Sequence, residues 1–190
     1  MPRRVVLKIS GEALASSASD QTIDAKVVDF LASEIAKATE SGELELALVV
    51  GGGNIWRGAS GELAGMNRAN SDIMGMLGTI INALALQDAI ENHGRQARVM
   101  TAINMDQVAE PYIRRRAVRH LEKGRIVIFA AGMGNPYCFD EAIQKELRVM
   151  DLTAITFCKD NDLPIRVFDL MKTDNLRRAL AGEAVGTLVK

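Results

Sequence analysis

The chain has 190 residues, of which 48% are hydrophobic, 25% charged and 4% aromatic, and its formal net charge is −1. These values are typical of a soluble globular protein, and we expect a single domain over residues 1–190 with a substantial core. The near-zero charge gives no bulk attraction to nucleic acid or to an anionic membrane, and the few aromatic residues argue against a surface that stacks single-stranded bases.

The cysteines and the N-terminus indicate the compartment. Cys138 and Cys158 have no metal-ligand spacing and form no disulfide framework, so we interpret them as reduced thiols in a cytoplasmic protein. The basic N-terminus runs directly into a strand-like segment, unlike a signal peptide. The most apolar long segment, 73–90, contains Asn82 and Asp88, which disfavours a membrane span.

The first expected strand, 5–9, is apolar except for Lys8, and Ser10-Gly11-Glu12 follows it. A lysine within a buried strand costs free energy unless its ammonium group reaches a polar site. Two interpretations stay open. Either Lys8 serves a site at the strand end, or the strand lies at a sheet edge with Lys8 in solvent.

The second expected strand, 44–50, ends in three consecutive glycines. A helix from Thr22, as its cap, to about Glu40 precedes it, so strand, helix and strand form a parallel unit. This places Gly11 and Gly51 at the same carboxyl edge of one sheet, where ligands bind in open α/β proteins. Consecutive glycines suit a backbone that approaches a phosphate, and Arg57 would add a positive fork. A glycine-rich turn without a ligand is the alternative.

A polar loop over 58–70 leads to a long helix that we expect Asp72 to open and that ends near Asn92. The helix is apolar nearly all round, so it is either central to the domain or part of a subunit contact. A third strand at 97–100 follows.

The remaining elements complete an α/β pattern. The helix expected over 106–123 carries several arginines, which we assign to a solvated face, and His120, which we expect at the surface. The fourth strand, 125–130, ends in Gly132-Met133-Gly134-Asn135, a third glycine loop at the same edge. Beyond it the pattern predicts helices over 138–148 and 173–181, and strands over 165–168 and 187–189. Val149-Met150-Asp151 leads into a further expected helix that ends near Asp160.

The motifs that are absent and the residues that remain favour phosphoryl transfer as the chemistry of the site. The sequence has no P-loop, no Gly-x-Gly-x-x-Gly after a strand, no Gly-x-Ser-x-Gly and no His-Glu-x-x-His. Glycine loops at one sheet edge, a lysine, an arginine and acids are what phosphoryl transfer requires, together with Mg²⁺.

Several segments together resemble the bacterial uridylate (UMP) kinases of the amino acid kinase family. The resemblance covers nearly the whole chain, and its Gly-Met-Asn-Arg and Val-Met-Asp segments are the parts that distinguish the UMP kinases. The segments are Lys8-Ile9-Ser10-Gly11-Glu12, Gly51 to Gly58, Gly65-Met66-Asn67-Arg68 with Asp72, Gly132 to Tyr137, Arg148-Val149-Met150-Asp151, Pro164 to Phe168, and Gly186-Thr187-Leu188.

The resemblance implies a three-layer αβα sandwich with a mainly parallel sheet, and a Mg²⁺-dependent transfer of the ATP γ-phosphate to UMP in pyrimidine nucleotide biosynthesis. It also implies a cytoplasmic homohexamer that GTP activates and UTP inhibits, with Asp88 near the effector site, and no metal-ligating residue of the protein itself. The implied site residues are Lys8 and Asp151 for catalysis; Lys8, Ser10, Gly11, Gly53 and Arg57 for ATP; and Gly52, Arg57, Asp72, Gly134 and Asn135 for UMP.

One departure from the family concerns the ATP-binding lobe. In the family several dozen residues follow the Asn-Pro-aromatic loop, whereas here Tyr137 is followed almost at once by Cys138 and the segment leading to Asp151. Either the printed sequence omits a segment near 137–140, which we favour, or the protein is shortened there. The shortened form would be a non-catalytic module that binds UMP or UTP, and a sister kinase acting on a carboxylate or carbamate is a third hypothesis.

Overall fold

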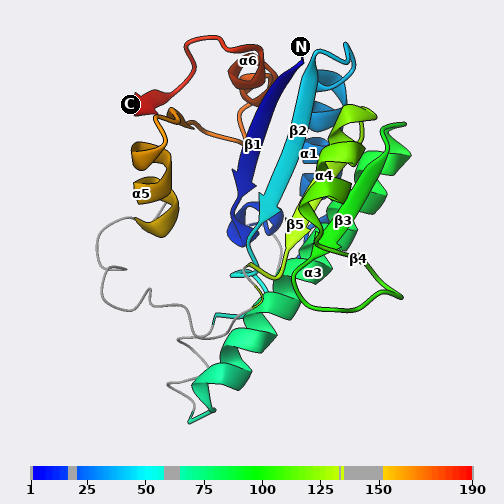
Figure 1. Ribbon diagram of the computed structural model, residues 1–190, viewed down its shortest axis with the longest axis vertical. Helices are drawn as coiled ribbons and strands as arrows, with labels where there is room; N and C mark the ends of the chain where they lie inside the picture. The colour runs from blue at the N-terminus through cyan, green and yellow to red at the C-terminus, as the bar shows by residue number, and fades with distance from the viewer. Residues whose placement is uncertain (1, 17–20, 58–64, 133, 135–151, 190) are drawn as a thin grey trace. The chain divides into compact units, whose positions relative to one another are not determined.

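The computed structural model describes residues 2–16, 21–57, 65–132, 134 and 152–189 (Figure 1). By its internal contacts the chain divides into two compact units, Met1–Pro136 and Tyr137–Lys190. The single domain expected over residues 1–190 stays a prediction.

The first unit is built on a five-stranded sheet in which every neighbouring pair is parallel. Because parallel strands end on the same side, the loops that follow them gather at one carboxyl edge. In spatial order the strands are β1 (Arg3–Ile9), β2 (Leu44–Val50), β5 (Ile126–Ala130), β3 (Ala97–Thr101) and β4 (Glu110–Pro111).

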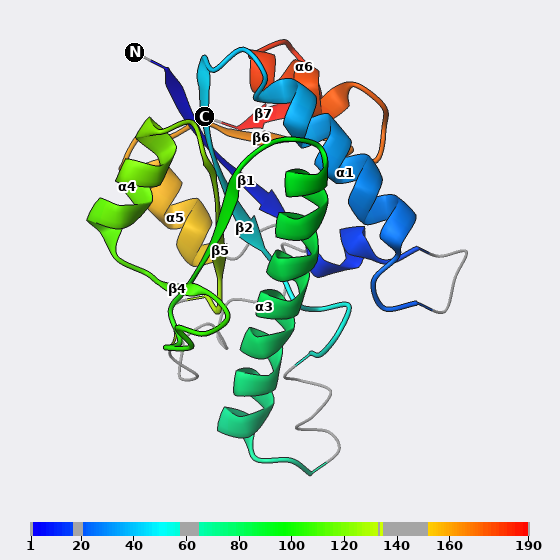
Figure 2. The same cartoon turned by 90° about the vertical axis from the view of Figure 1, so that its right-hand side faces the viewer.

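Helices cover both faces of this sheet (Figure 2). The helices α1 (Ala25–Ala38) and α3 (Arg68–Asn92) lie on one face, and α4 (Arg114–Glu122) lies on the other. On the α4 face, a buried cluster joins strand residues to the helix: Met100, Val127, Ala117 and Leu121, with Phe129 packed against them. The α/β layers and the mainly parallel sheet expected from the sequence are confirmed.

Two helices begin at residues other than those expected, and their caps explain why. The Asp24 side chain accepts a hydrogen bond from the Lys26 amide at 2.9 Å, so α1 begins at Ala25 and not at Thr22. The Asn67 side chain accepts from the amides of Ala69 and Asn70, so α3 begins at Arg68. Asp72 therefore lies in the second turn of α3 and does not open it.

The segment expected as one helix over 106–123 instead contains the short edge strand β4 and then α4. His120 is buried, contrary to its expected surface position. Its Nε2 lies 3.1 Å from Glu110 Oε2, and its Nδ1 lies 3.0 Å from Arg125 Nη1. A histidine can enter a core when both ring nitrogens have polar partners, and the partners here come from β4 and the α4–β5 turn.

The second unit contains α5 (Leu152–Asp160), β6 (Ile165–Val167), α6 (Asn175–Ala181) and β7 (Thr187–Val189). β6 and β7 pair antiparallel, which confirms the expected final strand. The helix expected over 138–148 and the proposed gap near 137–140 lie outside the described residues.

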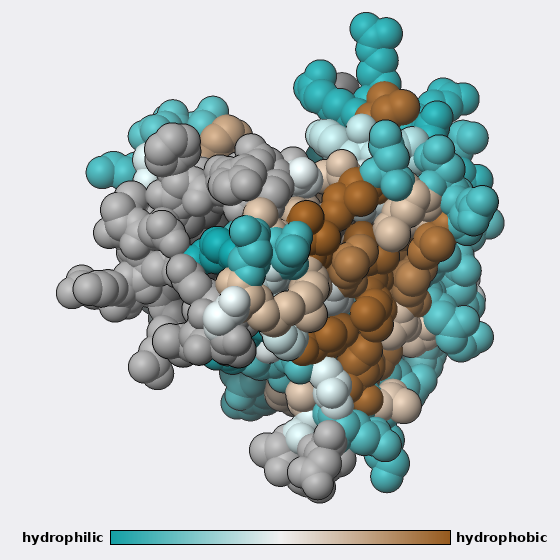
Figure 3. Space-filling view, turned by 90° about the horizontal axis from the view of Figure 1, so that it is seen from below, coloured by the Kyte–Doolittle hydropathy of each residue, from teal (hydrophilic) through white to brown (hydrophobic). Residues whose placement is uncertain are grey.

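Within the described residues, α3 is long and apolar enough to cross a membrane, with about a third of its most apolar window buried. A core helix of a soluble protein meets the same criterion, and α3 buries polar Ser71 and Asn82 within the first unit. Ile73, Leu77 and Ile81, one turn apart, are exposed at 39%, 38% and 49%. Figure 3 looks onto the carboxyl edge of the sheet and shows that hydrophobic surface (brown) gathers at this edge of the molecule.

Candidate active site

The loops after β1 and β2 touch backbone to backbone. The Gly51 amide donates to the Ile9 carbonyl at 2.9 Å. A Cβ at Gly51 would lie 2.9 Å from the Gly11 nitrogen, and a Cβ at Gly11 would lie 2.7 Å from the Gly53 nitrogen. The structure therefore brings Gly11 and Gly51 together as expected, and only glycine permits this approach.

Gly52 lies against the helix α3. A Cβ there would come within 2.7 Å of the Gly75 carbonyl oxygen and 2.8 Å of the Thr79 nitrogen. Gly78 contributes to the same contact, since a Cβ on it would lie 3.3 Å from the Gly52 carbonyl oxygen. The glycine loop after β2 thus packs closely against small residues of α3.

Arg57, which we expected to bind phosphate, forms an ion pair with Glu12 of the first glycine loop. Arg57 Nη2 donates to Glu12 Oε1 at 2.5 Å, and both side chains are at least half exposed. Glu12 Oε1 also lies over Gly53, where an added Cβ would meet it at 2.6 Å. A carboxylate therefore lies where the guanidinium and the glycine backbone could receive another anion.

Asn54 and Asn82 form a reciprocal amide pair beneath this loop. Asn82 Nδ2 donates to Asn54 Oδ1 and to the Gly51 carbonyl, both at 2.7 Å, and Asn54 Nδ2 donates to Asn82 Oδ1 at 3.2 Å. Asn54 Nδ2 also donates to the Thr22 carbonyl at 2.8 Å. The pair joins the second loop to α3 and to the segment before α1.

The third glycine loop begins with a non-glycine residue in the left-handed region. Ala131 has φ 66° and is fully buried, and its amide donates to Thr79 Oγ1 at 2.7 Å. The Gly134 amide in turn donates to the Ala131 carbonyl at 2.9 Å. Gly134 therefore lies at the expected edge, while Asn135 lies outside the described residues.

Lys8 is exposed on β1, which lies at an edge of the sheet. A role for Lys8 at the site stays a prediction. In register Lys8 stands beside Val49, which stands beside Phe129. Register partners point to the same face, so Lys8 lies on the face that α4 covers elsewhere. Lys8 is the residue before Ile9, the last residue of β1, so it lies near the carboxyl end of the strand. Ser10, the first residue after the strand, is also exposed.

Asp72 lies near the N-terminal end of α3. Both its carboxylate oxygens accept from Arg68 Nε at 3.0 Å, and its side chain is 20% exposed. Asp151, the second expected catalytic residue, lies outside the described residues. Asp88 is exposed farther along α3, where it accepts from Asn92 Nδ2 at 3.2 Å.

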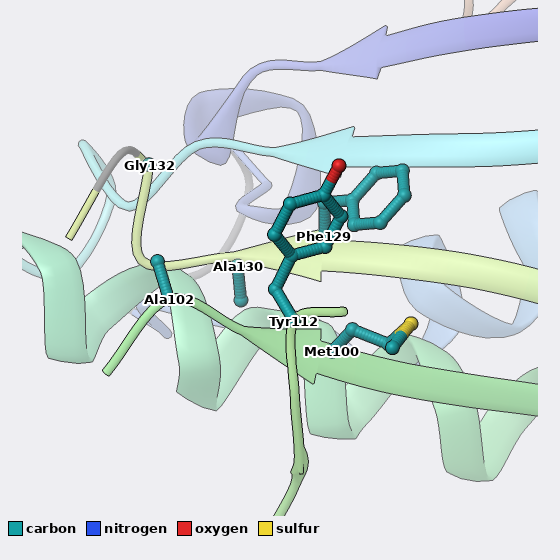
Figure 4. A pocket seen from close by; sticks show the side chains of 6 residues that line it. All are labelled: Met100, Ala102, Tyr112, Phe129, Ala130 and Gly132. Carbon is teal, nitrogen blue, oxygen red and sulfur yellow. The ribbon is translucent and has the colours of Figure 1, made fainter. Parts of the chain in front are cut away.

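A hollow of about 340 Å³ opens at the carboxyl ends of β3 and β5 (Figure 4). The Tyr112 and Phe129 rings meet edge to face across it, with centroids 5.5 Å apart. Its six lining residues are Met100, Ala102, Tyr112, Phe129, Ala130 and Gly132. Its size is at the lower end of small-ligand sites.

Metal binding at this edge would depend on a bound nucleotide. Among the described residues, no group of three or more His, Cys, Asp or Glu side chains could hold a metal ion. Mg²⁺ commonly binds through substrate phosphates with one or two carboxylates, and the amides and Arg57 at this edge suit such phosphates.

Sequence reasoning missed the roles of Glu12, Thr79 and Asn82. A polar side chain such as Asn82 within an otherwise apolar helix was a usable signal, since buried amides require partners. The partners themselves come from loops about 30 and 50 residues away, at Gly51 and Ala131. Local sequence does not show such contacts.

The fold and its edge define a class: an α/β protein whose glycine loops meet at the carboxyl edge of a parallel sheet, with an arginine above them. The model of the amino acid kinase family matches residues 3–139. The chain therefore belongs to the amino acid kinase family, and it is a kinase.

Solved structures provide further comparisons of the fold. A UMP kinase from Bacillus anthracis is similar with a TM-score of 0.87 and 34% identity, covering 100% of this chain and 97% of that chain. A UMP kinase from Ureaplasma parvum has the same TM-score at 28% identity, with 100% and 96% covered. These similarities confirm the resemblance to bacterial UMP kinases. An isopentenyl phosphate kinase, at 17% identity and TM-score 0.65, shares the fold, with 98% and 100% covered.

Proposed function

We propose that this protein is a Mg²⁺-dependent UMP kinase, which transfers the γ-phosphate of ATP to UMP and yields ADP and UDP in pyrimidine nucleotide biosynthesis. The observation that carries the proposal is the meeting of the first two glycine loops beneath Arg57 at one sheet edge. The similarity to the Bacillus anthracis UMP kinase over the whole chain supports the choice of acceptor.

The described residues suggest how the phosphates are held. Backbone amides of the glycine loops and the Arg57 guanidinium donate to phosphate oxygens, with Gly52 on the UMP side and Ser10, Gly11 and Gly53 on the ATP side. When UMP binds, its phosphate competes with the Glu12 carboxylate for Arg57. Because the charges are fixed in place before reaction, they stabilise charge as it develops.

The remaining roles concern the transferring group and the UMP nucleoside. Lys8 stabilises the transferring phosphoryl group, and its exposed side chain lies near the carboxyl end of β1, next to the first glycine loop. Asp72 accepts a hydrogen bond from the uridine ribose, and Gly134 with Asn135 completes the UMP side. Asp151 is the proposed second catalytic residue, which orients Lys8 or acts near the metal. Mg²⁺ bound with ATP would supply positive charge to the phosphates that the glycine-loop amides and Arg57 hold.

The assembly and its regulation belong to the same proposal. The exposed stripe of Ile73, Leu77 and Ile81 on α3 supports a homo-oligomer, with the hexamer as the expected form. GTP and UTP are the proposed effectors, with Asp88 near their site, in a cytoplasmic enzyme. Light scattering of the purified protein tests the oligomer, and a mass equal to one chain overturns it.

The decisive experiment measures ADP release with UMP, ATP and Mg²⁺. We expect release that requires all three, with little activity when AMP replaces UMP. Trp56 is the chain's one tryptophan and belongs to the second loop, so its fluorescence reports UMP binding separately from turnover. UMP binding without ATP binding or ADP release would overturn the kinase and favour the non-catalytic nucleotide-binding module. ADP release with a carboxylate or carbamate acceptor but not with UMP would favour the sister kinase.

A further inference from the structure

One face of α3 contacts two of the glycine loops. Residues spaced i, i+4, i+7, i+8 and i+11 share a helix face, and Ser71, Gly75, Gly78, Thr79 and Asn82 have this spacing. Ser71 Oγ accepts from Trp56 Nε1 at 2.9 Å, and the two glycines admit the backbone of the second loop. The same face therefore carries the side chains that reach the loops.

Asn82 holds the second loop from below. Its amide nitrogen uses both of its hydrogens, one on the Gly51 carbonyl and one on Asn54 Oδ1, and its oxygen accepts from Asn54 Nδ2. Asn82 is fully buried, so water cannot reach the side chain to take the place of these hydrogen bonds. An apolar side chain there leaves the Gly51 carbonyl with one partner fewer.

Thr79 holds the third loop. Its hydroxyl donates to the Met76 carbonyl at 2.7 Å and accepts from the Ala131 amide at 2.7 Å. Ala131 is buried in the left-handed region, a conformation that is costly for alanine and persists when its surroundings fix it. A hydroxyl is a small group that can donate one hydrogen bond and accept another at the same time. Serine has the same hydroxyl as threonine.

We propose that Thr79 and Asn82 are positioning residues that hold the second and third glycine loops in one arrangement along α3. Resting on the proposed function, the inference adds that this arrangement lets a UMP molecule contact both loops at once. Neither side chain touches the nucleotide. Each acts through a backbone group, the Gly51 carbonyl or the Ala131 amide. A preorganised site loses rate when its supporting contacts loosen.

The first test needs no ligand. Thr79→Val keeps the shape of the side chain and removes the hydroxyl, while Thr79→Ser keeps the hydroxyl. We expect Thr79→Val to speed amide hydrogen exchange at Ala131 by about tenfold or more, since that amide loses its partner, and Thr79→Ser to restore protection. Unchanged exchange at Ala131 in Thr79→Val would overturn the role of Thr79.

The second ligand-free test reads the second loop through Trp56. Asn82→Leu keeps the branching of the side chain and removes both donors, and we expect greater quenching of Trp56 fluorescence by acrylamide. The matched control is Ile90→Val, which trims a fully buried side chain near the far end of the same helix. It lowers the melting temperature but leaves Trp56 quenching unchanged. Equal quenching in Asn82→Leu and Ile90→Val would overturn the role of Asn82; if Asn82→Leu does not fold, Asn54→Ala removes the same amide pair.

The third test asks what the arrangement does for UMP. We expect Thr79→Val to raise the KM for UMP about tenfold and to leave the KM for ATP within about twofold, with rescue by Thr79→Ser. An equal rise in the KM for UMP in Ile90→Val would show that the change reflects lower stability, and it would overturn the inference. If the wild-type protein gives no UMP-dependent ADP release, the proposed function fails, while the exchange and quenching results still decide whether the two residues hold the loops.

Discussion

Glu12 and Arg57 join the first glycine loop to the second through an ion pair of 2.5 Å between Oε1 and Nη2. The pair is largely exposed, so its contribution to folding stability is small, about 0–1 kcal/mol. Its placement above the Gly53 backbone gives it a different consequence. The carboxylate holds the guanidinium that we propose binds phosphate, so in the proposed mechanism a phosphate must displace the carboxylate.

This relationship predicts opposite effects from its two partners. Arg57→Lys removes the planar fork, and we expect kcat/KM for UMP to fall by about 100-fold. Glu12→Gln removes the competing charge but keeps the size, so we expect the KM for UMP to fall or stay unchanged. Steady-state kinetics with both variants provide the test. A large rise in KM for Glu12→Gln would show that the carboxylate assists binding instead of competing with it.

Lys8 gives a prediction that separates catalysis from folding. Because its side chain is exposed, Lys8→Met should change the melting temperature little while it lowers kcat by about 100-fold or more. Lys26→Met, on the exposed side of α1, is the matched control and should leave kcat unchanged. Normal turnover in Lys8→Met would remove Lys8 from the mechanism and leave Arg57 as the cation of the site.

The glycines of the second loop and of α3 should respond to alanine in opposite directions. Gly52→Ala places a methyl group within 2.8 Å of two backbone atoms of α3, and we expect a loss of about 1–3 kcal/mol in the free energy of unfolding. Gly75→Ala meets its first neighbour, the Trp56 carbonyl oxygen, at 3.9 Å. It should gain up to about 1 kcal/mol from helix propensity. Urea unfolding of both variants measures the difference in the free energy of unfolding. Equal changes in the two variants would contradict the close packing of the second loop against α3.

The parallel sheet and its glycine edge could be predicted from sequence because each depends on short segments. The alternation of apolar runs with a helical pattern requires a parallel crossover, and this fixes Gly11 and Gly51 at one edge. The start of α3 was harder, since Asn67 and Asp72 are both plausible caps and the structure uses Asn67. The two residues of β4 are too few to give a pattern.

The supporting contacts of the site could not be predicted in the same way. Asn82 and Thr79 act on backbone groups that are 31 and 52 residues away, and those distances in sequence leave no periodic signal. His120 illustrates the same point, because its burial depends on Glu110 and Arg125 meeting both ring nitrogens. What a buried polar residue contacts is decided by the tertiary fold.

Asp72 provides a test of how the sugar of the acceptor is recognised. Its carboxylate is held by Arg68 near the start of α3, and we propose that it accepts from a ribose hydroxyl. Asp72→Ala should therefore raise the KM for UMP about tenfold and reduce the preference for UMP over its 2′-deoxy or 3′-deoxy form, since a site built to bind a hydroxyl discriminates against its absence. Arg68→Ala is the control, because it removes the ion pair but keeps the carboxylate. If Arg68→Ala loses the preference for UMP over its deoxy forms to the same degree as Asp72→Ala, the ion pair acts by shaping the start of the helix. If Arg68→Ala keeps this preference and Asp72→Ala loses it, the carboxylate itself binds the ribose hydroxyl.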